Sequence, residues 1–245
     1  MSNSNTILID GQEVPFEPGE TVLAAAKKAD VYIPHLCFHP EVTVHGSCKL
    51  CTVKINGRCV SSCLTKASSG MAVENSSEEI LDLRKQLIEL LFAEGNHYCP
   101  TCELSGNCQL QALAYEFGIT HTRFPLQYPI REMDATHPDI ILDRDRCINC
   151  SLCRRASAQV DKKDVFSLAG RGPETYLQVH SSDGTLGQSK LTVDDLAANI
   201  CPVGALFHKK NNYSQRPGQR IYDNQSIGEV GNQRLERVKE GENHG

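Results

Sequence analysis

Short apolar runs alternate with turn sequences over the first 75 residues, which predicts a small β-rich domain. The pairs Asp10-Gly11 and Asn56-Gly57 each separate two runs with strand-like patterning. An Asx-Gly pair between such runs is typical of a two-residue β-hairpin turn. Between the two hairpins, Thr21 is placed to cap a short helix that ends near Ala29.

Helical spacing replaces this pattern over residues 76–120. Ser76 is followed three residues later by Glu79, a capping-box pattern that predicts a helix start. Apolar side chains at helical spacing form the expected buried stripe of this helix: Ile80, Leu83, Leu87, Leu90 and Leu91. We expect this helix to end at Gly95 and a second, short helix to cover residues 109–117.

The remaining residues form a third expected domain and a tail. Residues 165–180 have the pattern of a strand pair, and residues 192–199 have that of a helix. From residue 208 onward the chain is polar and rich in Gln, Asn and Gly, which predicts either disorder or a strap across a partner subunit. The expected domains of this α+β chain are residues 1–75, 76–120, 121–207 and the tail 208–245.

The charge balance excludes some classes of function. The chain has 245 residues, 25 basic and 30 acidic side chains, and a formal net charge of −5. It has no basic stretch of the kind that binds nucleic acid. No apolar run approaches the roughly 20 residues that span a bilayer, and residues 1–5 lack the layout of a secretory signal. We therefore expect a cytoplasmic protein without a nucleic-acid partner or a membrane span.

Twelve cysteines point to the chemistry of the chain. Cytoplasmic thiols stay reduced, so this many cysteines indicate metal or redox chemistry and not a disulfide framework. They fall into three groups along the chain, each with at least one Cys-x2-Cys pair, and Cys201 stands apart. A tight turn with that spacing directs two sulfurs at the same metal.

The first candidate site has the spacing C-x10-C-x2-C-x11-C. Its residues are Cys37, Cys48, Cys51 and Cys63. A plant-type [2Fe–2S] site has a shorter first loop but the same central pair and distal ligand. Four thiolates also suit zinc, although the spacing is not that of two zinc knuckles, so iron–sulfur is favoured. Cys59, in a strand after the Asn-Gly turn, is the one cysteine left over and is interpreted as structural.

The second candidate site holds three cysteines and needs a fourth ligand. Its residues are His97, Cys99, Cys102 and Cys108. His97 is the nearest candidate, because Cys59 and His121 need favourable folding to reach the site. Exchange of one thiolate for a neutral imidazole makes a [4Fe–4S] site less negative, so this site is expected to accept an electron at a higher potential.

The third candidate site combines C-x2-C-x2-C with a distant Cys-Pro pair. Its residues are Cys147, Cys150, Cys153 and Cys201. Bacterial ferredoxins with this spacing exchange the fourth cysteine between two clusters. Here the second triplet is absent, because Leu191, Asp194 and Ala197 occupy its places. The spacing therefore predicts one [4Fe–4S] cluster.

Several common catalytic motifs are missing from the chain. It has no G-x-G-x-x-G after a strand, no P-loop and no nucleophile elbow. A chain with three clusters, about ten iron atoms and no evident flavin or nicotinamide motif is expected to conduct electrons, with its redox partners on other subunits.

The order of the three sites resembles that of the diaphorase-side gamma subunits of cytoplasmic NAD-reducing [NiFe] hydrogenases. The strings FAEGNH at 92–97, CQLQA at 108–112 and CPVGAL at 201–206 carry the likeness. The chain is also similar to the amino-terminal part of the large iron–sulfur subunit of NADH:quinone oxidoreductase and to that region of iron-only hydrogenases. Complex I subunits usually have H-x3-C at the second site, whereas this chain has H-x1-C, as the short hydrogenase subunits do.

This resemblance implies a β-grasp ferredoxin-like domain, a small helical domain with the His97 site and an α+β ferredoxin-like domain. It implies an oxidoreductase subunit with no substrate-converting site of its own. FMN, NAD and the Ni–Fe centre are expected on a flavin subunit and on the hydrogenase small and large subunits. The Cys37 site would lie nearest the flavin, the Cys147 site in the middle and the His97 site towards the hydrogenase. An NAD-dependent formate dehydrogenase and a complex I-like enzyme remain alternatives, because ligand spacing does not separate them.

Overall fold

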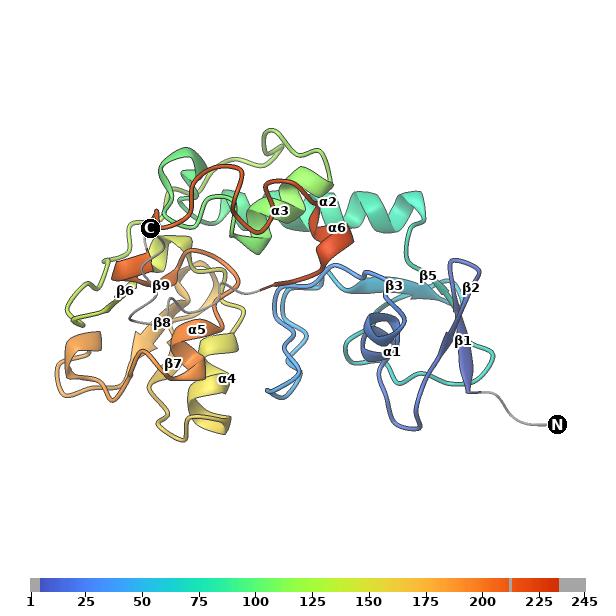
Figure 1. Cartoon of the computed structure of the whole chain (residues 1–245), viewed down its shortest axis with the longest axis horizontal. Helices are drawn as coiled ribbons and strands as arrows, with labels where there is room; N and C mark the ends of the chain where they lie inside the picture. The colour runs from blue at the N-terminus through green and yellow to red at the C-terminus, as the bar shows by residue number, and fades with distance from the viewer. Residues whose placement is uncertain (1–4, 212, 234–245) are drawn as a thin grey trace.

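The computed structural model describes residues 5–211 and 213–233 of the chain. Figure 1 shows a β-sheet unit near the N-terminus, a second unit of short strands and helices at the other end, and helix α2 (Glu78–Ala93) lying along the top. Among the described residues, no helix combines the length and the apolar character needed to cross a membrane.

The N-terminal unit is a five-stranded sheet with strand order β2-β1-β5-β3-β4. Its strands are β1 (Thr6–Ile9), β2 (Gln12–Pro15), β3 (Thr52–Ile55), β4 (Arg58–Ser61) and β5 (Ala72–Glu74). Strands β1 and β5 are parallel, and the other neighbours are antiparallel. Helix α1 (Val22–Lys28) buries Leu23 and Ala26 in the core of this unit.

Both expected hairpins are confirmed. Asp10 and Gly11 have φ of +49° and +86°, and Asn56 and Gly57 have φ of +50° and +76°. Positive φ at both central positions matches the right-handed twist of the flanking strands. The expected cap is also confirmed, because the Thr21 hydroxyl accepts a hydrogen bond of 3.2 Å from the backbone N–H of Ala24.

Helix α2 differs from the sequence prediction in its start and in its buried face. Its N-cap is Ser77 and not Ser76, and Glu79 forms an ion pair of 2.6 Å with Lys54 of β3 instead of closing a capping box. Leu90 of the expected stripe is 37% exposed, while Arg84 is buried. The buried face therefore follows Ile80, Arg84 and Ile88. Arg84 is buried because it donates hydrogen bonds to carbonyl groups of the neighbouring sheet unit, as described below.

Helix α3 (Gln109–Glu116) packs against α2 and agrees with the prediction to within one residue. A 3-10 turn at Cys99–Thr101 lies between the two helices. The described part of the tail folds back onto this helical unit through α6 (Ile227–Val230), whose Ile227 is fully buried. In the structure, residues 213–233 thus pack against the helical unit. The residues numbered 212 and 234–245 lie outside the described part, and contact of the tail with a partner stays a prediction.

The third unit contains two small antiparallel sheets and two helices. Strand β6 (Ile140–Leu142) pairs with β9 (Leu206–His208), and β7 (Phe166–Ala169) pairs with β8 (Tyr176–Val179). Helix α4 (Leu152–Gln159) packs against α5 (Leu196–Asn199). The predicted strand pair is thus confirmed, whereas the helix predicted over residues 192–199 is limited to its last turn.

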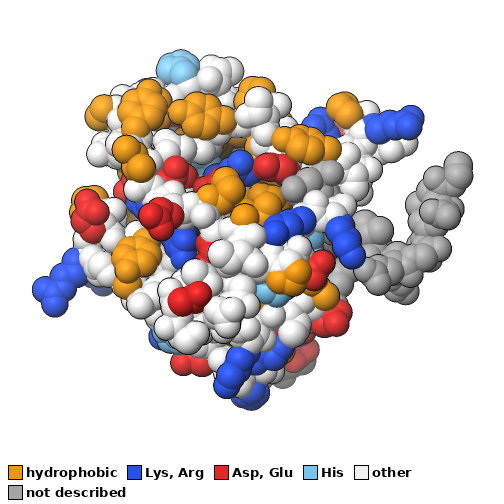
Figure 2. All heavy atoms as spheres, turned by 90° about the vertical axis from the view of Figure 1, so that its left-hand side faces the viewer, with side chains coloured by type: hydrophobic (Ala, Val, Ile, Leu, Met, Phe, Trp, Pro, Cys, Tyr) orange, Lys and Arg blue, Asp and Glu red, His pale blue; other side chains and the backbone are white. Residues whose placement is uncertain are grey.

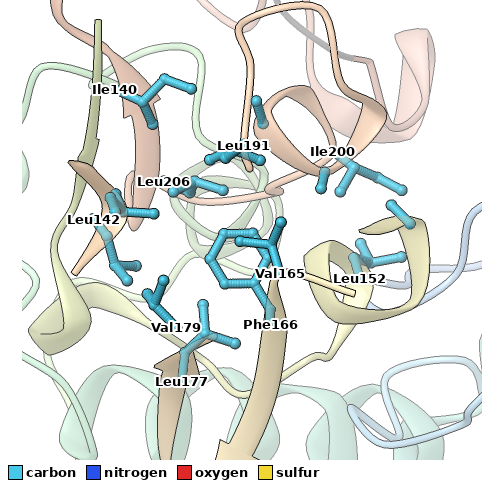
Figure 3. Packing of buried hydrophobic residues seen from close by; sticks show 14 of the residues in the cluster. Ile140, Leu142, Leu152, Val165, Phe166, Leu177, Val179, Leu191, Ile200 and Leu206 are labelled. Carbon is cyan, nitrogen blue, oxygen red and sulfur yellow. The ribbon is translucent and has the colours of Figure 1, made fainter. Parts of the chain in front are cut away.

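One apolar core holds this unit together. In Figure 3 the Phe166 ring lies between the side chains of the two strand pairs and those of α4 and α5. Phe166 is fully buried, and Leu142, Leu177 and Leu206 are nearly so. Burial of side chains of this size contributes about 1.5–3 kcal/mol each relative to exposure. This core surrounds the segments that carry the third cysteine set.

Three candidate iron–sulfur sites

The first cysteine set lies on the loops beside β3 and β4. Its four thiols form two pairs joined by side-chain hydrogen bonds, Cys37 with Cys48 and Cys51 with Cys63. The sulfurs of Cys51 and Cys63 are 3.2 Å apart, and the backbone N–H of Cys48 donates a hydrogen bond of 3.5 Å to the sulfur of Cys37. Two pairs of thiols are the arrangement that a two-iron cluster requires, with one pair for each iron.

Hydrogen bonds between the paired thiols change their acidity. The contact with Cys48 lowers the pKa of Cys37, and the contact with Cys63 lowers the pKa of Cys51. The same contacts, together with burial, raise the pKa values of Cys48 and Cys63. One thiol of each pair is thus poised to ionise, which favours exchange of its proton for a metal, because the thiolate is the form that binds metals.

Arg84 supports the loop that carries this first set. Its guanidinium donates hydrogen bonds of 3.1 Å to the carbonyl of Leu50 and 2.9 Å to that of Thr52, on either side of Cys51. Two further bonds, both to Asn75, complete its partners. Burial lowers the pKa of Arg84 to about 10, so the group stays charged at neutral pH. The charged Arg84 side chain on α2 therefore holds the loop of the sheet unit that carries Cys51.

The second set lines one small cavity between the helical unit and the third unit. The ligand candidates at this cavity are His97, Cys99, Cys102 and Cys108. The Nε2 atom of His97 is buried and has no hydrogen-bond partner among the described residues. Since buried polar atoms are nearly always paired, this free nitrogen fits a metal ligand.

The protonation states at the second set also fit metal binding. Burial, and to a lesser degree the positive charge of Arg146, lower the pKa of His97 to about 4. His97 is therefore neutral at pH 7, the form in which imidazole binds metals. Burial raises the pKa of Cys108 to about 12, so this thiol gives up its proton only to a strongly bound cation.

The third set lines a second small cavity, whose walls are mostly apolar. Its cysteines are Cys147, Cys150, Cys153 and Cys201. Asn149 and Ser151 have φ of +50° and +59°, so the chain between the first three cysteines turns tightly before α4 begins. Burial raises the pKa of all four thiols, that of Cys147 to about 11. The apolar lining explains the raised pKa values, because it disfavours a charged thiolate.

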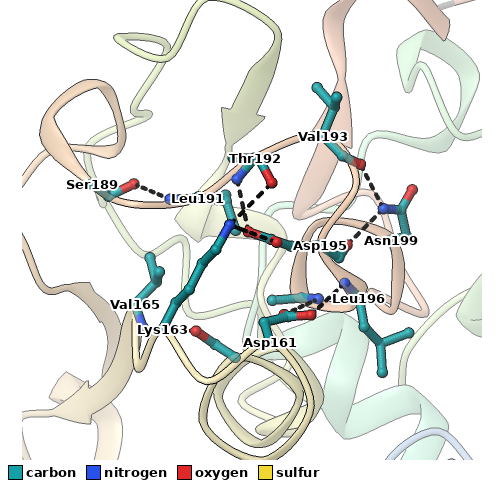
Figure 4. A network of polar contacts seen from close by, with 12 residues as sticks. Asp161, Lys163, Val165, Ser189, Leu191, Thr192, Val193, Asp195, Leu196 and Asn199 are labelled. Atoms are coloured by element: carbon teal, nitrogen blue, oxygen red, sulfur yellow. Dashed lines mark hydrogen bonds and ion pairs between the residues drawn. The ribbon is translucent and has the colours of Figure 1, made fainter.

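A polar network holds Cys201 in place opposite the other three cysteines. Figure 4 shows Lys163 reaching Asp195, with the two charged groups 2.7 Å apart. The carboxylate of Asp161 accepts hydrogen bonds of 2.9 Å from the N–H groups of Leu196 and Ala197, at the start of α5. The segment after α4 thereby fixes the helix that leads directly to Cys201.

The segments that carry the second and third sets are in direct contact. The Nη1 atom of Arg146, the residue before Cys147, lies 3.5 Å from the sulfur of Cys102. The backbone N–H of Gln109 donates a hydrogen bond of 3.0 Å to the carbonyl of Pro202. A Cβ atom at Gly204 would lie 3.1 Å from the Cys102 sulfur, so glycine allows the backbones of the two sites to approach.

The structure thus brings each predicted ligand set together, and the ligand assignments themselves stay predictions. Among the described residues, no three His, Cys, Asp or Glu side chains are close enough to hold a single metal ion. A cluster has a core of several atoms, so its ligands stand further apart than those of one ion. Cys59 is exposed in β4, with its sulfur 3.9 Å from Oε1 of Glu79.

Comparison with known proteins identifies the family. Three family models match the chain: a 2Fe-2S iron–sulfur cluster binding domain over residues 2–78, the NADH-ubiquinone oxidoreductase-G iron–sulfur binding region over 84–123, and the ferredoxin-like domain of NADH-quinone oxidoreductase subunit 3 over 137–207. These matches confirm the expected fold class and the presence of both [2Fe–2S] and [4Fe–4S] domains.

Relatives and solved structures agree with these matches. The gamma subunit of the NAD-reducing hydrogenase HoxS of Cupriavidus necator is 39% identical over 222 residues, which are 90% of this chain and 94% of that subunit. The mitochondrial 78 kDa subunit of NADH-ubiquinone oxidoreductase of Candida albicans is 30% identical over 215 residues, 86% of this chain but only 29% of that subunit.

A chain in the crystal structure of an NAD+-reducing [NiFe]-hydrogenase in the H2-reduced state has 48% identity and a TM-score of 0.88. The match covers 91% of this chain and 95% of that one. Sequence and structure therefore agree over nearly the full length of the short hydrogenase subunits. The chain belongs to the family of gamma subunits of NAD-reducing hydrogenases.

Proposed function

We propose that this chain carries electrons between a [NiFe] hydrogenase module and a diaphorase subunit that binds FMN and NAD(H). The complete reaction is H2 + NAD+ = H+ + NADH, in which H2 gives up two electrons and two protons and NAD+ takes up two electrons and one proton. The observation that carries this proposal is the near full-length match to gamma subunits of such enzymes. When bound, the three clusters would supply sites that accept and release single electrons.

The residues of this chain hold and space those sites. The apolar walls around the third set exclude water, and the neutral imidazole of His97 leaves the second set with less negative charge than four thiolates would. Contacts of the third set reach the second set through Arg146 and the first set through Arg155. This arrangement supports the order first set, third set, second set for electron transfer between the flavin side and the hydrogenase side.

An exposed apolar surface beside the second set supports the placement of the hydrogenase module there. Tyr98, Tyr115 and Tyr128 are each at least 60% exposed and line a cavity of about 690 Å³ next to His97. Figure 2 shows the side of the molecule that is on the left in Figure 1, and hydrophobic side chains gather on its upper part. Exposed tyrosines in an apolar patch are typical of protein interfaces, and a partner bound here would bring its own redox centre close to the second set.

We further propose that the complex works in the cytoplasm. The cysteines of the described residues form no disulfide, and a cysteine-rich chain without disulfides is typical of a reducing compartment, which supports the cytoplasm. Fractionation of the source cells, followed by detection of this chain, tests the proposal. Recovery with the cytoplasmic enzymes is expected, and recovery with periplasmic or membrane fractions would contradict it.

Metal analysis of the intact complex tests the proposed function. The complex is purified anaerobically through a tag on this chain, and its metals are measured. Nickel together with iron is the expected result. Molybdenum or tungsten without nickel would indicate a formate dehydrogenase, and iron without any of these metals would indicate a complex I-like enzyme.

A further inference from the structure

Arg155 joins the first and third cysteine sets through their backbones. It lies in the first turns of α4 and is 4% exposed. One nitrogen, Nη2, donates hydrogen bonds of 2.7 Å to the carbonyl of Cys37 and 3.2 Å to that of Cys150. One residue of each set thus shares the same guanidinium group, although 112 residues lie between them in the sequence.

The other contacts of Arg155 belong to the same two loops. Its Nε donates a hydrogen bond of 3.0 Å to the carbonyl of Ser151, and its Nη1 donates to the carbonyl of Thr43. One turn later on α4, Gln159 accepts a hydrogen bond of 2.8 Å from the N–H of Thr43 and donates one of 2.7 Å to its hydroxyl. Arg155 and Gln159 therefore hold the loop of the first set against the helix of the third.

The charge of Arg155 has no carboxylate among these partners. All four hydrogen-bond acceptors are neutral carbonyl groups. A buried cation is costly unless an anion compensates it, and guanidinium does not lose its proton in proteins. Each set of four thiolates with a bound oxidised cluster would carry a formal charge of about −2. Clusters at the first and third sites would thus supply compensating negative charge on both sides of Arg155.

We propose that Arg155 is a positioning residue for electron transfer between the first and third sites. It fixes the separation of the two ligand loops, and its charge stabilises the negative charge that each site gains on reduction. This inference rests on the proposed function, since it requires clusters at both sites. Arg155 acts through the loops that it binds and through its field, because none of its hydrogen bonds goes to a sulfur.

Arg84 provides a matched control within the same chain. It is also buried, at 2% exposure, and it also donates only to neutral oxygen atoms. Its contacts lie beside Cys51 of the first set, and none of its hydrogen bonds reaches a residue of the third. Loss of Arg84 removes a buried charge near one site only, whereas loss of Arg155 removes a charge shared by two.

The experiment is an EPR-monitored redox titration of the intact complex with wild-type chain, Arg155→Gln, Arg155→Lys or Arg84→Gln. Arg155→Gln is expected to lower the midpoint potentials of both the first and the third cluster and to leave that of the second unchanged. Arg84→Gln is expected to lower that of the first alone. Arg155→Lys keeps the charge, so the midpoint potentials of the first and third clusters are expected to stay close to their wild-type values.

The distance between the two sites provides a second readout. The magnetic interaction between the reduced first and third clusters is expected to weaken in Arg155→Gln and to persist in Arg84→Gln. A wild-type potential at either site in Arg155→Gln would overturn the inference. Loss of cluster iron from both Arg155→Gln and Arg155→Lys would also overturn it, since it would show a role in folding alone. Absence of the cluster signals from the wild-type complex would instead contradict the proposed function.

Discussion

The backbone of Gly95 lies directly against the imidazole ring of His97. A Cβ atom at residue 95 would come within 2.6 Å of Nε2 of His97 and within 2.9 Å of the carbonyl oxygen of Asp145. Because that carbonyl also accepts a hydrogen bond of 3.0 Å from the N–H of Asn96, it has little freedom to move. Gly95 follows the C-cap of α2, Glu94, and its small size sets the position of the proposed fourth ligand.

Substitution of Gly95 by alanine is therefore expected to displace the His97 ring. Overpacking of this kind costs about 1–3 kcal/mol, and the EPR signal of the second cluster should be lost or altered while the other two remain. Gly204→Ala is the milder comparison, since its Cβ would meet the Cys102 sulfur at 3.1 Å. Three unchanged signals in Gly95→Ala would show that the ring position does not matter.

The proposed role of His97 leads to a second prediction. His97→Ala should leave the first and third clusters intact and slow hydrogen-driven NAD+ reduction, because the second site would lose a ligand. His97→Cys should retain a cluster at this site with a lower midpoint potential, since a thiolate replaces a neutral group. Redox titration and the rate of NADH formation provide the measurements. An unchanged rate in His97→Ala would argue that His97 is not a ligand.

Cys59 is expected to be dispensable. It is exposed in β4, and its sulfur lies 3.9 Å from a carboxylate oxygen of Glu79. Cys59→Ser should keep the [2Fe–2S] signal and the iron content, with a change in unfolding free energy within about 0.5 kcal/mol. Cys63→Ser serves as the comparison that should lose the signal. Loss of the signal in Cys59→Ser would instead mean that Cys59 is a ligand.

The described part of the tail depends on the ion pair between Arg220 and Asp223, whose charged groups are 2.7 Å apart. Hydrogen bonds from Arg220 lower the pKa of Asp223 from 3.8 to about 2. The carboxylate therefore contributes stability above pH 3.8, and this contribution is lost as the pH falls through about 2. At pH 7, Asp223→Asn should remove about 1 kcal/mol and speed tryptic cleavage after Arg220, which precedes Ile221. Cleavage at the wild-type rate would contradict this role.

Local features of the chain were predictable because their causes are local. The Asn56-Gly57 turn and the Thr21 cap depend on the conformations of a few adjacent residues, and both agree with the structure. The grouping of the cysteines also follows from short spacings, since a tight turn brings nearby sulfurs together. The position of His97 two residues before Cys99 predicted its place beside the three cysteines, and it lines the same cavity.

Features that depend on distant partners were missed. Arg84 interrupts the expected apolar stripe of α2 because its carbonyl partners lie 32 and 34 residues earlier in the sequence. Arginine is usually a surface residue, so nothing in the sequence indicated that Arg146 and Arg155 lie at the contacts between sites. Only the fold places them there. The tail has a polar sequence, yet in its described part Ile227 is fully buried and α6 packs against α3.

The central claim is that this chain holds one [2Fe–2S] and two [4Fe–4S] clusters. Iron and acid-labile sulfide, measured on the anaerobically reconstituted chain, test it most directly. The account predicts about ten iron and ten sulfide per chain and a brown protein. A colourless zinc-containing protein, or values well below ten of each, would contradict it.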